Sequence, residues 1–234
     1  MFFIQDPVKR QIGQYYYLKS LIESYQSYVN EWVNKTLKDI EGEAIASSEG
    51  EDDKEIALSI YTSVYSQGAD AIYEQTDSEN LLFYKAMLIM VYSYYEGIIN
   101  KMAADAEVKD IRPSSICEKD GKELSEESKE KAVYLFDNIL PLRNHLCHND
   151  SGTKDRDYEK TVRALMNLYN TKCIDMVFQK NSEGHITLET CSVFWINEDF
   201  ILDVLDKEHD ILIELSEKSG YKDEYIDRQP NRSL

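Results

Sequence analysis

The sequence predicts a mainly α-helical fold with one small β-hairpin near its C-terminal end. Apolar residues recur at steps of three and four along most of the 234 residues, which is the period of an amphipathic helix. After Cys173 the pattern changes to two short runs that flank a polar turn containing glycine, as in a hairpin. A composition of 42% hydrophobic and 30% charged residues is typical of a globular chain with a sizeable core.

The chain should begin with a long helix. Asp6 followed by Pro7 is a helix start signal, and a stripe of apolar residues continues from there to about Ile40. Residues 41–55 hold seven acids and one lysine together with two glycines, so we expect a solvated loop there.

Two further helices should follow this loop. The first should cover residues 55–65 and end near Gly68, and the second should run from residue 78 to about residue 106. The latter is apolar nearly all round at its centre, so it should lie in the middle of the bundle or at a dimer seam. Residues 107–124, with Pro113, should form an exposed connection.

The next helices are marked by a cap and by helix breakers. Ser125 can cap a helix that Pro141 should kink or restart, and a short helical piece should then cover residues 142–147. The polar residues 149–152 end it. A further helix, with Thr153 as a possible cap, carries an apolar stripe from about residue 158 to residue 169.

The C-terminal part should combine the hairpin with one more helix. The strands are expected at residues 174–178 and 185–190, and Asn197 should cap the last helix. We expect a helical bundle of residues 1–170, then residues 171–220 packed on the same domain, and a flexible tail of residues 221–234.

Several classes of protein are disfavoured. The N-terminal apolar segment of four residues is too short for a signal peptide, and no stretch approaches the roughly 20 apolar residues of a membrane span. We therefore expect a cytoplasmic protein that does not contact a membrane. The four cysteines form no CxxC pair and the nine glycines form no phosphate-binding loop, so no cofactor is expected.

One segment, residues 141–150, contains groups that can do chemistry. Arg143 offers a planar guanidinium suited to a phosphate, and His148 can move a proton to or from a hydroxyl near neutral pH. The two groups suffice for metal-free phosphodiester cleavage, in which Arg143 stabilises the charge on the phosphate oxygens. His145, Cys147 and His148 are too close in sequence to build a closed tetrahedral site, so no metal is expected.

The spacing of these residues sets a condition on their cooperation. Arg143 and His148 are five residues apart, about 140° around a regular helix, whereas Asn144 and His148 share a face. Arg143 and His148 can converge if the helix ends near His148. They can also converge across a symmetric dimer, in which each chain supplies one set.

The run Arg-Asn-His-Leu-Cys-His from Arg143 to His148 resembles the signature of the HEPN superfamily, an arginine and a histidine separated by four to six residues. Tyr94-Tyr95-Glu96-Gly97 is similar to an aromatic-Glu-Gly element that often occurs in an earlier helix of that family. The resemblance covers roughly residues 10–170. It implies an up-down helical bundle, a homodimer with a composite cleft, and frequently a metal-independent endoribonuclease that is a toxin or defence effector, in some systems with an antitoxin protein.

By this resemblance Arg143, Asn144 and His148 are the candidate catalytic residues, and Glu96 and His145 are candidate supporting residues. Glu96 lies within an apolar helix, so it should be paired or lie in a cleft. An alternative is a catalytically inactive HEPN-like module for dimerisation or for binding a protein or nucleotide. A generic helical adaptor is a third possibility and predicts no paired arginine and histidine.

The net charge of −18 argues against a protein that coats nucleic acid through bulk charge. Residues 137–163, however, hold five acids and five basic residues, so this stretch is neutral. Lys154, Arg156, Lys160 and Arg163 are the candidate RNA-binding residues, and the last three recur at helical steps of four and three.

Overall fold

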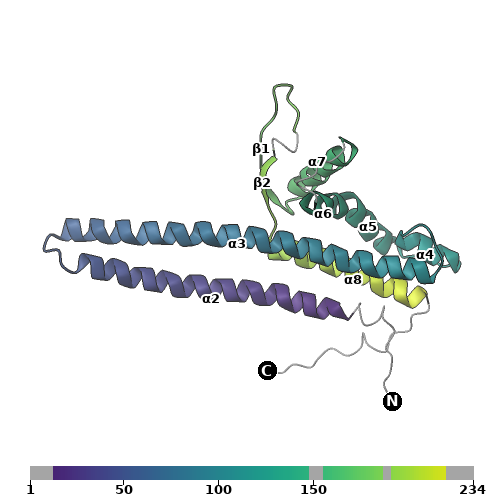
Figure 1. Ribbon diagram of the computed structural model, residues 1–234, viewed down its shortest axis with the longest axis horizontal. Helices are drawn as coiled ribbons and strands as arrows, with labels where there is room; N and C mark the ends of the chain where they lie inside the picture. Colours follow the sequence, from purple (N-terminus) through teal and green to yellow (C-terminus); the bar gives the residue numbers. More distant parts are fainter. Residues whose placement is uncertain (1–12, 148–154, 187–190, 220–234) are drawn as a thin grey trace, which may run out of the picture. The chain divides into compact units, whose positions relative to one another are not determined.

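The structure, a computed structural model, describes residues 13–147, 155–186 and 191–219 (Figure 1). In chain order it contains α2 (Gln14–Ser48), α3 (Lys54–Asp105), α4 (Pro113–Lys119), α5 (Glu126–Tyr134), the π-helical turn η1 (Leu135–Ile139), α6 (Leu140–Cys147), α7 (Asp155–Asn170), β1 (Asp175–Phe178), β2 (Cys191–Trp195) and α8 (Glu198–Lys218). The prediction of a mainly α-helical fold with a small hairpin is confirmed. The expected start signal at Asp6 and Pro7, the cap at Thr153 and the tail of residues 221–234 lie outside the described residues.

The chain forms two compact units. One comprises Leu21–Phe83, and the other combines residues 13–20 with the described residues from Tyr84 onward. Along its described length, no helix has both the length and the apolar character needed to cross a membrane.

The unit of Leu21–Phe83 is an antiparallel pair of helices, formed by most of α2 and the first part of α3 (Figure 1). The predicted loop at residues 41–55 is wrong over most of its length, because α2 continues to Ser48 and α3 starts at Lys54. Glutamate and alanine are good helix formers, and Ala44 is completely buried, so packing extends the helix through the acidic stretch.

The predicted helix end near Gly68 is also wrong, since α3 runs without a break from Lys54 to Asp105. Gly68 serves packing instead of termination. A Cβ atom at this position would lie only 2.7 Å from Cγ2 of Ile40, so the missing side chain lets the two helices approach closely.

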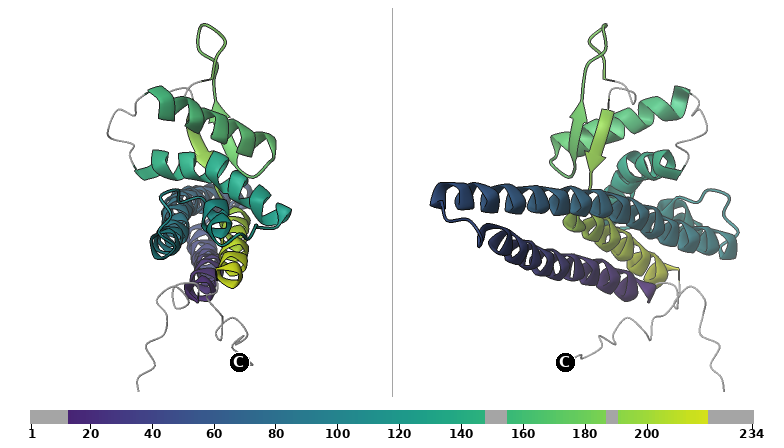
Figure 2. Two further views of the ribbon diagram at one scale, coloured as in Figure 1. Left: turned by 90° about the vertical axis from the view of Figure 1, so that its right-hand side faces the viewer. Right: turned by 60° about the vertical axis from the view of Figure 1, so that its left-hand side comes forward.

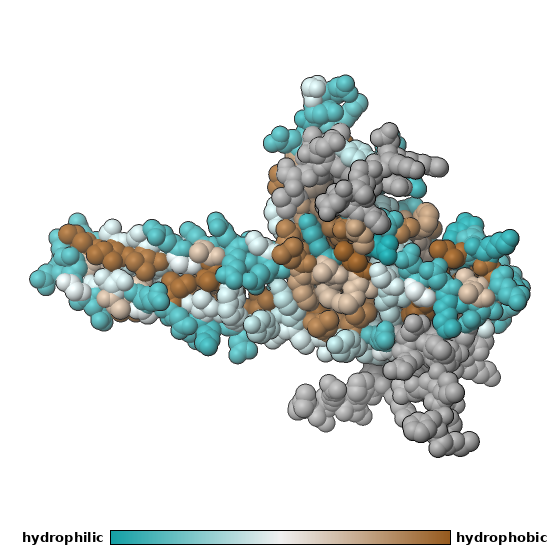
Figure 3. All heavy atoms as spheres, in the orientation of Figure 1, coloured by the Kyte–Doolittle hydropathy of each residue, from teal (hydrophilic) through white to brown (hydrophobic). Residues whose placement is uncertain are grey.

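Apolar side chains reach the surface along α3 (Figure 3). The exposed ones in the first part of this helix are Ile56, Leu58, Tyr73 and Leu82. Two helices alone enclose little interior, so part of their apolar surface stays at the outside of this unit.

The core of the other unit contains the second part of α3 and α8, which lie side by side (Figures 1 and 2). The predicted cap of α8 is confirmed, because the side chain of Asn197 accepts a hydrogen bond from the backbone N–H of Phe200. Glu208 is fully buried in this helix, and burial raises the pKa of its carboxyl well above the usual range.

The connection between α3 and α5 is more ordered than the sequence predicts. Residues 107–124 contain α4, in which Pro113 occupies the first turn and does not break the chain direction. Ile116 and Cys117 are buried, so this segment contributes to the core. Ser125 caps α5 as predicted, by accepting a hydrogen bond from the N–H of Ser128.

The hairpin differs from the prediction in its second strand. β1 pairs antiparallel with β2 at Cys191–Trp195, which follows the predicted strand at residues 185–190; residues 187–190 lie outside the described residues. In this register Met176 lies opposite Phe194 and both are buried, which explains why the later segment is selected.

Candidate functional site

Arg143 projects from α6 to α3. Its Nη2 donates to Oε2 of Glu96 at 2.9 Å and to Oγ of Ser93 at 3.3 Å, and its Nη1 donates to Oδ1 of Asn144 at 2.9 Å. The side chain of Arg143 is 18% exposed and that of Glu96 is 34% exposed. The expectation that Glu96 needs a partner is confirmed. The pair is partly shielded from water, so its attraction exceeds that of a surface ion pair.

The guanidinium is not saturated by these bonds. Nε of Arg143 is buried and has no hydrogen-bond partner in the described chain. The face of the Tyr92 ring lies 5.9 Å from Cζ of Arg143. Glu96 and Asn144 therefore fix the orientation of the guanidinium and leave part of its donor capacity unused.

Pro141 and a π-helical turn set the position of α6. Pro141 is the second residue of α6 and has no N–H to donate to the preceding turn. The helix accommodates it by widening: η1 precedes α6, and the N–H of Leu140 bonds to the carbonyl of Leu135, five residues back. The predicted change at Pro141 thus takes the form of a π-helical turn, η1, which runs directly into α6 one residue before the proline.

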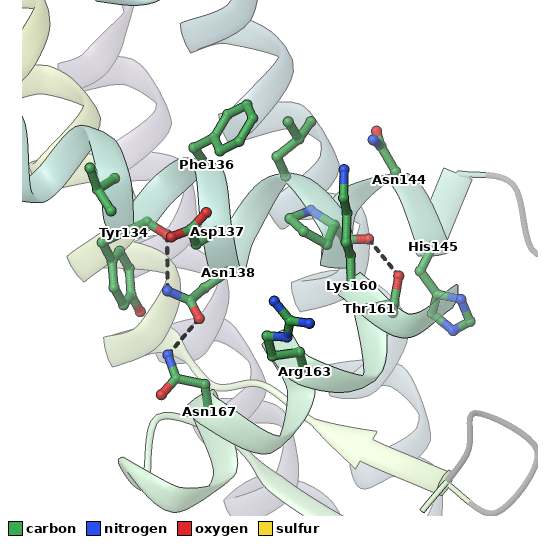
Figure 4. A pocket seen from close by; sticks show the side chains of 13 residues that line it. Tyr134, Phe136, Asp137, Asn138, Asn144, His145, Lys160, Thr161, Arg163 and Asn167 are labelled. Atoms are coloured by element: carbon green, nitrogen blue, oxygen red, sulfur yellow. Dashed lines mark hydrogen bonds between the residues drawn. The ribbon is translucent and has the colours of Figure 1, made fainter. Parts of the chain in front are cut away.

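A pocket of about 630 Å³ lies between η1, α6 and α7 (Figure 4). Its lining combines amide, basic and apolar side chains: Val133, Tyr134, Phe136, Asp137, Asn138, Leu140, Pro141, Asn144, His145, Lys160, Thr161, Arg163 and Asn167. Asn144 belongs to both features, because its carbonyl oxygen accepts from Arg143 while its side chain lines the pocket.

Hydrogen bonds fix the walls of this pocket. Asn167 donates to Oδ1 of Asn138 at 2.6 Å, and Nδ2 of Asn138 donates to the carbonyl of Tyr134 at 3.1 Å (Figure 4). The hydroxyl of Thr161 donates to the carbonyl of Pro141 at 3.4 Å and joins α7 to α6. The amide pair and this contact hold α7 against η1 and α6.

The pocket carries two basic side chains and one acidic one. Lys160 and Arg163 extend from α7 into it, whereas Asp137 is the only carboxylate among its described lining residues (Figure 4). Within the described ranges, no carboxylate lies within 4.0 Å of either basic group. Among the described residues, the pocket lining therefore holds one more basic than acidic side chain, although the whole chain has a charge of −18.

His145 lines the same pocket and is partly buried. Burial, assisted by the nearby charge of Lys85, lowers the pKa of its imidazole. His145 is therefore neutral at pH 7 and can accept one hydrogen bond and donate another. The Nζ of Lys85 itself lies 4.0 Å from the centroid of the Phe194 ring, and burial lowers the pKa of Lys85.

A second hollow of about 620 Å³ lies on the other side of η1 and is mainly apolar. It is lined by α3, α4, α5 and η1 and includes Glu96, the partner of Arg143. Val133 and Phe136 line both hollows and are 59% and 56% exposed. The Arg143 ion pair is thus bordered by an exposed apolar surface.

The structure divides the predicted site residues into two groups. Glu96, Arg143 and Asn144 form one bonded cluster, and Asn144 joins it to the pocket that also contains His145, Lys160 and Arg163. His148 and Lys154 lie outside the described residues, and Arg156 belongs to α7 without a described side chain.

The pocket residues that sequence reasoning missed include Phe136, Asn138 and Asn167. A signal that could have pointed to Phe136 and Asn138 is Pro141, because a proline near the start of a helix disturbs the preceding turn. Asn167 carries no such signal, since its pairing with Asn138 exists only after α7 packs on η1.

No protein-family model, curated protein or solved structure matches this chain.

Proposed function

We propose that this chain is a metal-independent endoribonuclease of HEPN type that acts as a homodimer. The observation that carries the proposal is the Arg143 guanidinium, which Glu96 and Asn144 hold in a fixed, partly buried position. Arg143 lies in α6, whose described part runs to Cys147, and His148 is the next residue in the sequence. The arginine and the histidine can converge if the helix ends near His148 or if two copies of the chain form a symmetric dimer.

In the proposed reaction His148 removes the proton from a ribose 2′-hydroxyl. The 2′-oxygen then attacks the adjacent phosphorus and the bond to the 5′-oxygen breaks, which leaves a 2′,3′-cyclic phosphate and a 5′-hydroxyl. A protonated imidazole returns the proton to the leaving oxygen. Arg143 stabilises the charge that develops on the non-bridging oxygens, and Glu96 and Asn144 keep its donors in position.

The charge around α6 supports RNA as the substrate. Lys160 and Arg163 face the pocket beside Asn144 without a described carboxylate partner. Because the rest of the chain is strongly acidic, a polyanion would be repelled elsewhere and attracted here. The acidic bulk would also suit a basic antitoxin protein, if cleavage of cellular RNA makes the chain a toxin or a defence effector.

The apolar hollow beside Glu96 supports the homodimer. Ile111 and Val133 are 49% and 59% exposed there, and exposed apolar surface rimmed by charged groups is typical of an interaction site. A second copy on this surface would bring its own α6 segment towards the Arg143 cluster and create a composite cleft.

The proposal is tested with purified protein on mixed RNA substrates, with EDTA present. We expect Arg143→Ala and His148→Ala each to reduce cleavage by about 10²-fold or more. His185→Ala and Lys180→Ala, which change exposed residues near the hairpin turn, are matched controls and should cleave as wild type does. Cleavage by His148→Ala at the wild-type rate would contradict the proposal.

A second candidate is a non-catalytic module with the same fold. The ion pair itself favours it, since Glu96 already neutralises the charge of Arg143 within one chain. This candidate predicts that wild-type protein leaves all RNA substrates intact. It also predicts that Arg143→Ala lowers thermal stability while the oligomeric state, measured by light scattering, stays the same.

A further inference from the structure

The pocket between η1, α6 and α7 has the properties of a ligand site. We infer that it binds one nucleotide of a single-stranded RNA next to the scissile phosphate. Lys160 and Arg163 would contact its phosphate, and the amide of Asn144 would contact its base. The identity of the ligand as part of an RNA strand rests on the proposed function, whereas the nucleotide chemistry rests on the pocket.

The charges of the pocket select an anion. Lys160 and Arg163 are on adjacent turns of α7 and both reach into the pocket, where Asp137 supplies the single negative charge (Figure 4). Elsewhere in the described chain several lysines pair with acids, such as Lys131 with Asp210 at 2.8 Å. Two basic side chains without such a partner, directed at one space, are suited to a phosphate.

The remaining lining selects a planar ring that can form hydrogen bonds. Asn144 uses its carbonyl oxygen for Arg143, so its amide nitrogen remains as a donor towards the pocket. Asn167 lies at the opposite end of the pocket from Asn144, where its amide nitrogen donates to Asn138 (Figure 4). Phe136 at the rim is 56% exposed and offers an aromatic face on which a base can stack.

The size and rigidity of the pocket agree with this ligand. Its volume of about 630 Å³ falls in the range of roughly 300–1,000 Å³ that is usual for small-molecule sites. Asn138 is buried and bonded at both ends of its amide, so Asn167 is held in place before a ligand arrives.

Asn144 connects this pocket to the proposed reaction. Its carbonyl oxygen lies 2.9 Å from Nη1 of Arg143, and its side chain also forms part of the pocket wall. A nucleotide bound in the pocket would therefore lie within one side chain of the guanidinium. This position corresponds to the nucleotide adjacent to the scissile phosphate.

The binding test uses the full-length His148→Ala variant, so that RNA is not cut during the measurement. The probes are adenosine monophosphate, adenosine, inorganic phosphate, a single-stranded RNA decamer and poly-glutamate, measured by calorimetry and fluorescence anisotropy. We expect the monophosphate and the decamer to bind and adenosine to bind much more weakly.

Adding Lys160→Glu and Arg163→Glu to that variant should weaken decamer binding at least tenfold. The slope of the binding constant against salt concentration, both on logarithmic scales, should fall by the equivalent of about two phosphate contacts. Lys160→Arg, which keeps the positive charge at this position, should bind the decamer as tightly as the His148→Ala variant does. Lys180→Glu is the matched charge reversal outside the pocket and should leave decamer binding unchanged. Both pocket residues are exposed, so thermal unfolding should show that the variants keep the wild-type fold.

Equal binding by the double variant and the Lys180→Glu control would overturn the inference. Equal affinity for poly-glutamate and for RNA would overturn it too, because the pocket would then select acidic peptide as readily as nucleotide. If His148 proves essential for cleavage but the pocket variants keep the wild-type KM, the pocket inference fails and the proposed function stands. If no RNA is cut but the monophosphate binds and is lost in the double variant, the proposed function fails and the pocket stands.

Discussion

Glu96 on α3 and Arg143 on α6 are joined by a hydrogen-bonded ion pair of 2.9 Å between Oε2 and Nη2. The two residues are 47 positions apart in the chain, so the pair forms only after α6 has packed on α3. Through this contact α3 orients the arginine of the run from Arg143 to His148. Its charge and its geometry have separate effects that two substitutions can distinguish.

Glu96→Gln should keep a hydrogen bond to Arg143 but remove the negative charge. We expect RNA to bind more tightly, with a KM several-fold lower, because the guanidinium is no longer neutralised. Glu96→Ala removes both the charge and the bond, so it should lower kcat at least tenfold and cost about 1 kcal/mol of stability. Steady-state cleavage kinetics and urea unfolding measure the two effects. Identical kinetics for both variants would show that Glu96 does not position Arg143.

Glu208 should make the stability of the protein depend on pH. It is completely buried, neither carboxylate oxygen has a hydrogen-bond partner among the described residues, and burial raises its pKa well above the ordinary range of a carboxyl group. The folded state therefore holds this proton to higher pH than the unfolded state does. Its contribution is fully present below the unfolded pKa and is lost as the pH rises towards the folded pKa.

Glu208→Gln keeps the shape of the side chain and removes the ionisation. We expect it to raise the free energy of unfolding by roughly 1–3 kcal/mol at pH 8 and to change it little at pH 4. Urea unfolding at pH 4, 6 and 8 measures the difference. Glu217→Gln, on the exposed side of α8, is the matched control. A difference from wild type that is the same at pH 4 and pH 8 would contradict this account.

His145 should titrate below its ordinary range because of burial and the nearby Lys85 charge. Lys85→Met keeps an unbranched apolar side chain and removes the charge, so the pKa of His145 should rise while burial still holds it below 6.5. NMR titration of the imidazole resonances measures the shift. Lys180→Met, at an exposed position, should leave the titration unchanged. An unaltered pKa in Lys85→Met would show that burial alone is responsible.

Two glycines in the helix pair of Leu21–Phe83 should respond in opposite ways to alanine. Gly68→Ala should destabilise the protein, because the new Cβ atom would lie 2.7 Å from Cγ2 of Ile40. The side chain of isoleucine is branched at Cβ, so this methyl group has little freedom to move away. Gly42→Ala should stabilise it by up to about 1 kcal/mol, because no heavy atom lies within 4 Å of that position and alanine favours the helix. Thermal unfolding of the two variants gives the comparison. A gain in both would mean that the helices do not pack closely at Gly68.

Local signals in the sequence predicted the features that depend on neighbouring residues. The caps at Ser125 and Asn197 were predictable because a capping side chain bonds to a backbone N–H only three residues away. The change from helical to strand pattern after Cys173 was predictable for the same local reason. The need of Glu96 for a partner followed from a charge placed among apolar residues.

Contacts between distant segments decided where the long helices end and which segment pairs with β1. Whether Gly68 ends a helix or allows close packing depends on Ile40, which lies on the neighbouring helix. Which segment pairs with β1 depends on burial, since pairing with β2 places the buried Phe194 opposite the buried Met176. Neither partner can be identified from the local pattern, because propensity and periodicity describe a residue only in relation to its near neighbours.

The sequence by itself therefore determined the helical class of this protein and the run from Arg143 to His148 that carries its candidate chemistry. Only the tertiary structure decided that Arg143 binds Glu96 and that Asn144 lines the pocket with Lys160 and Arg163. The reason is physical: side chains on one short helix point in different directions, and the surface that each one meets is set by the packing of α6 against α3 and α7.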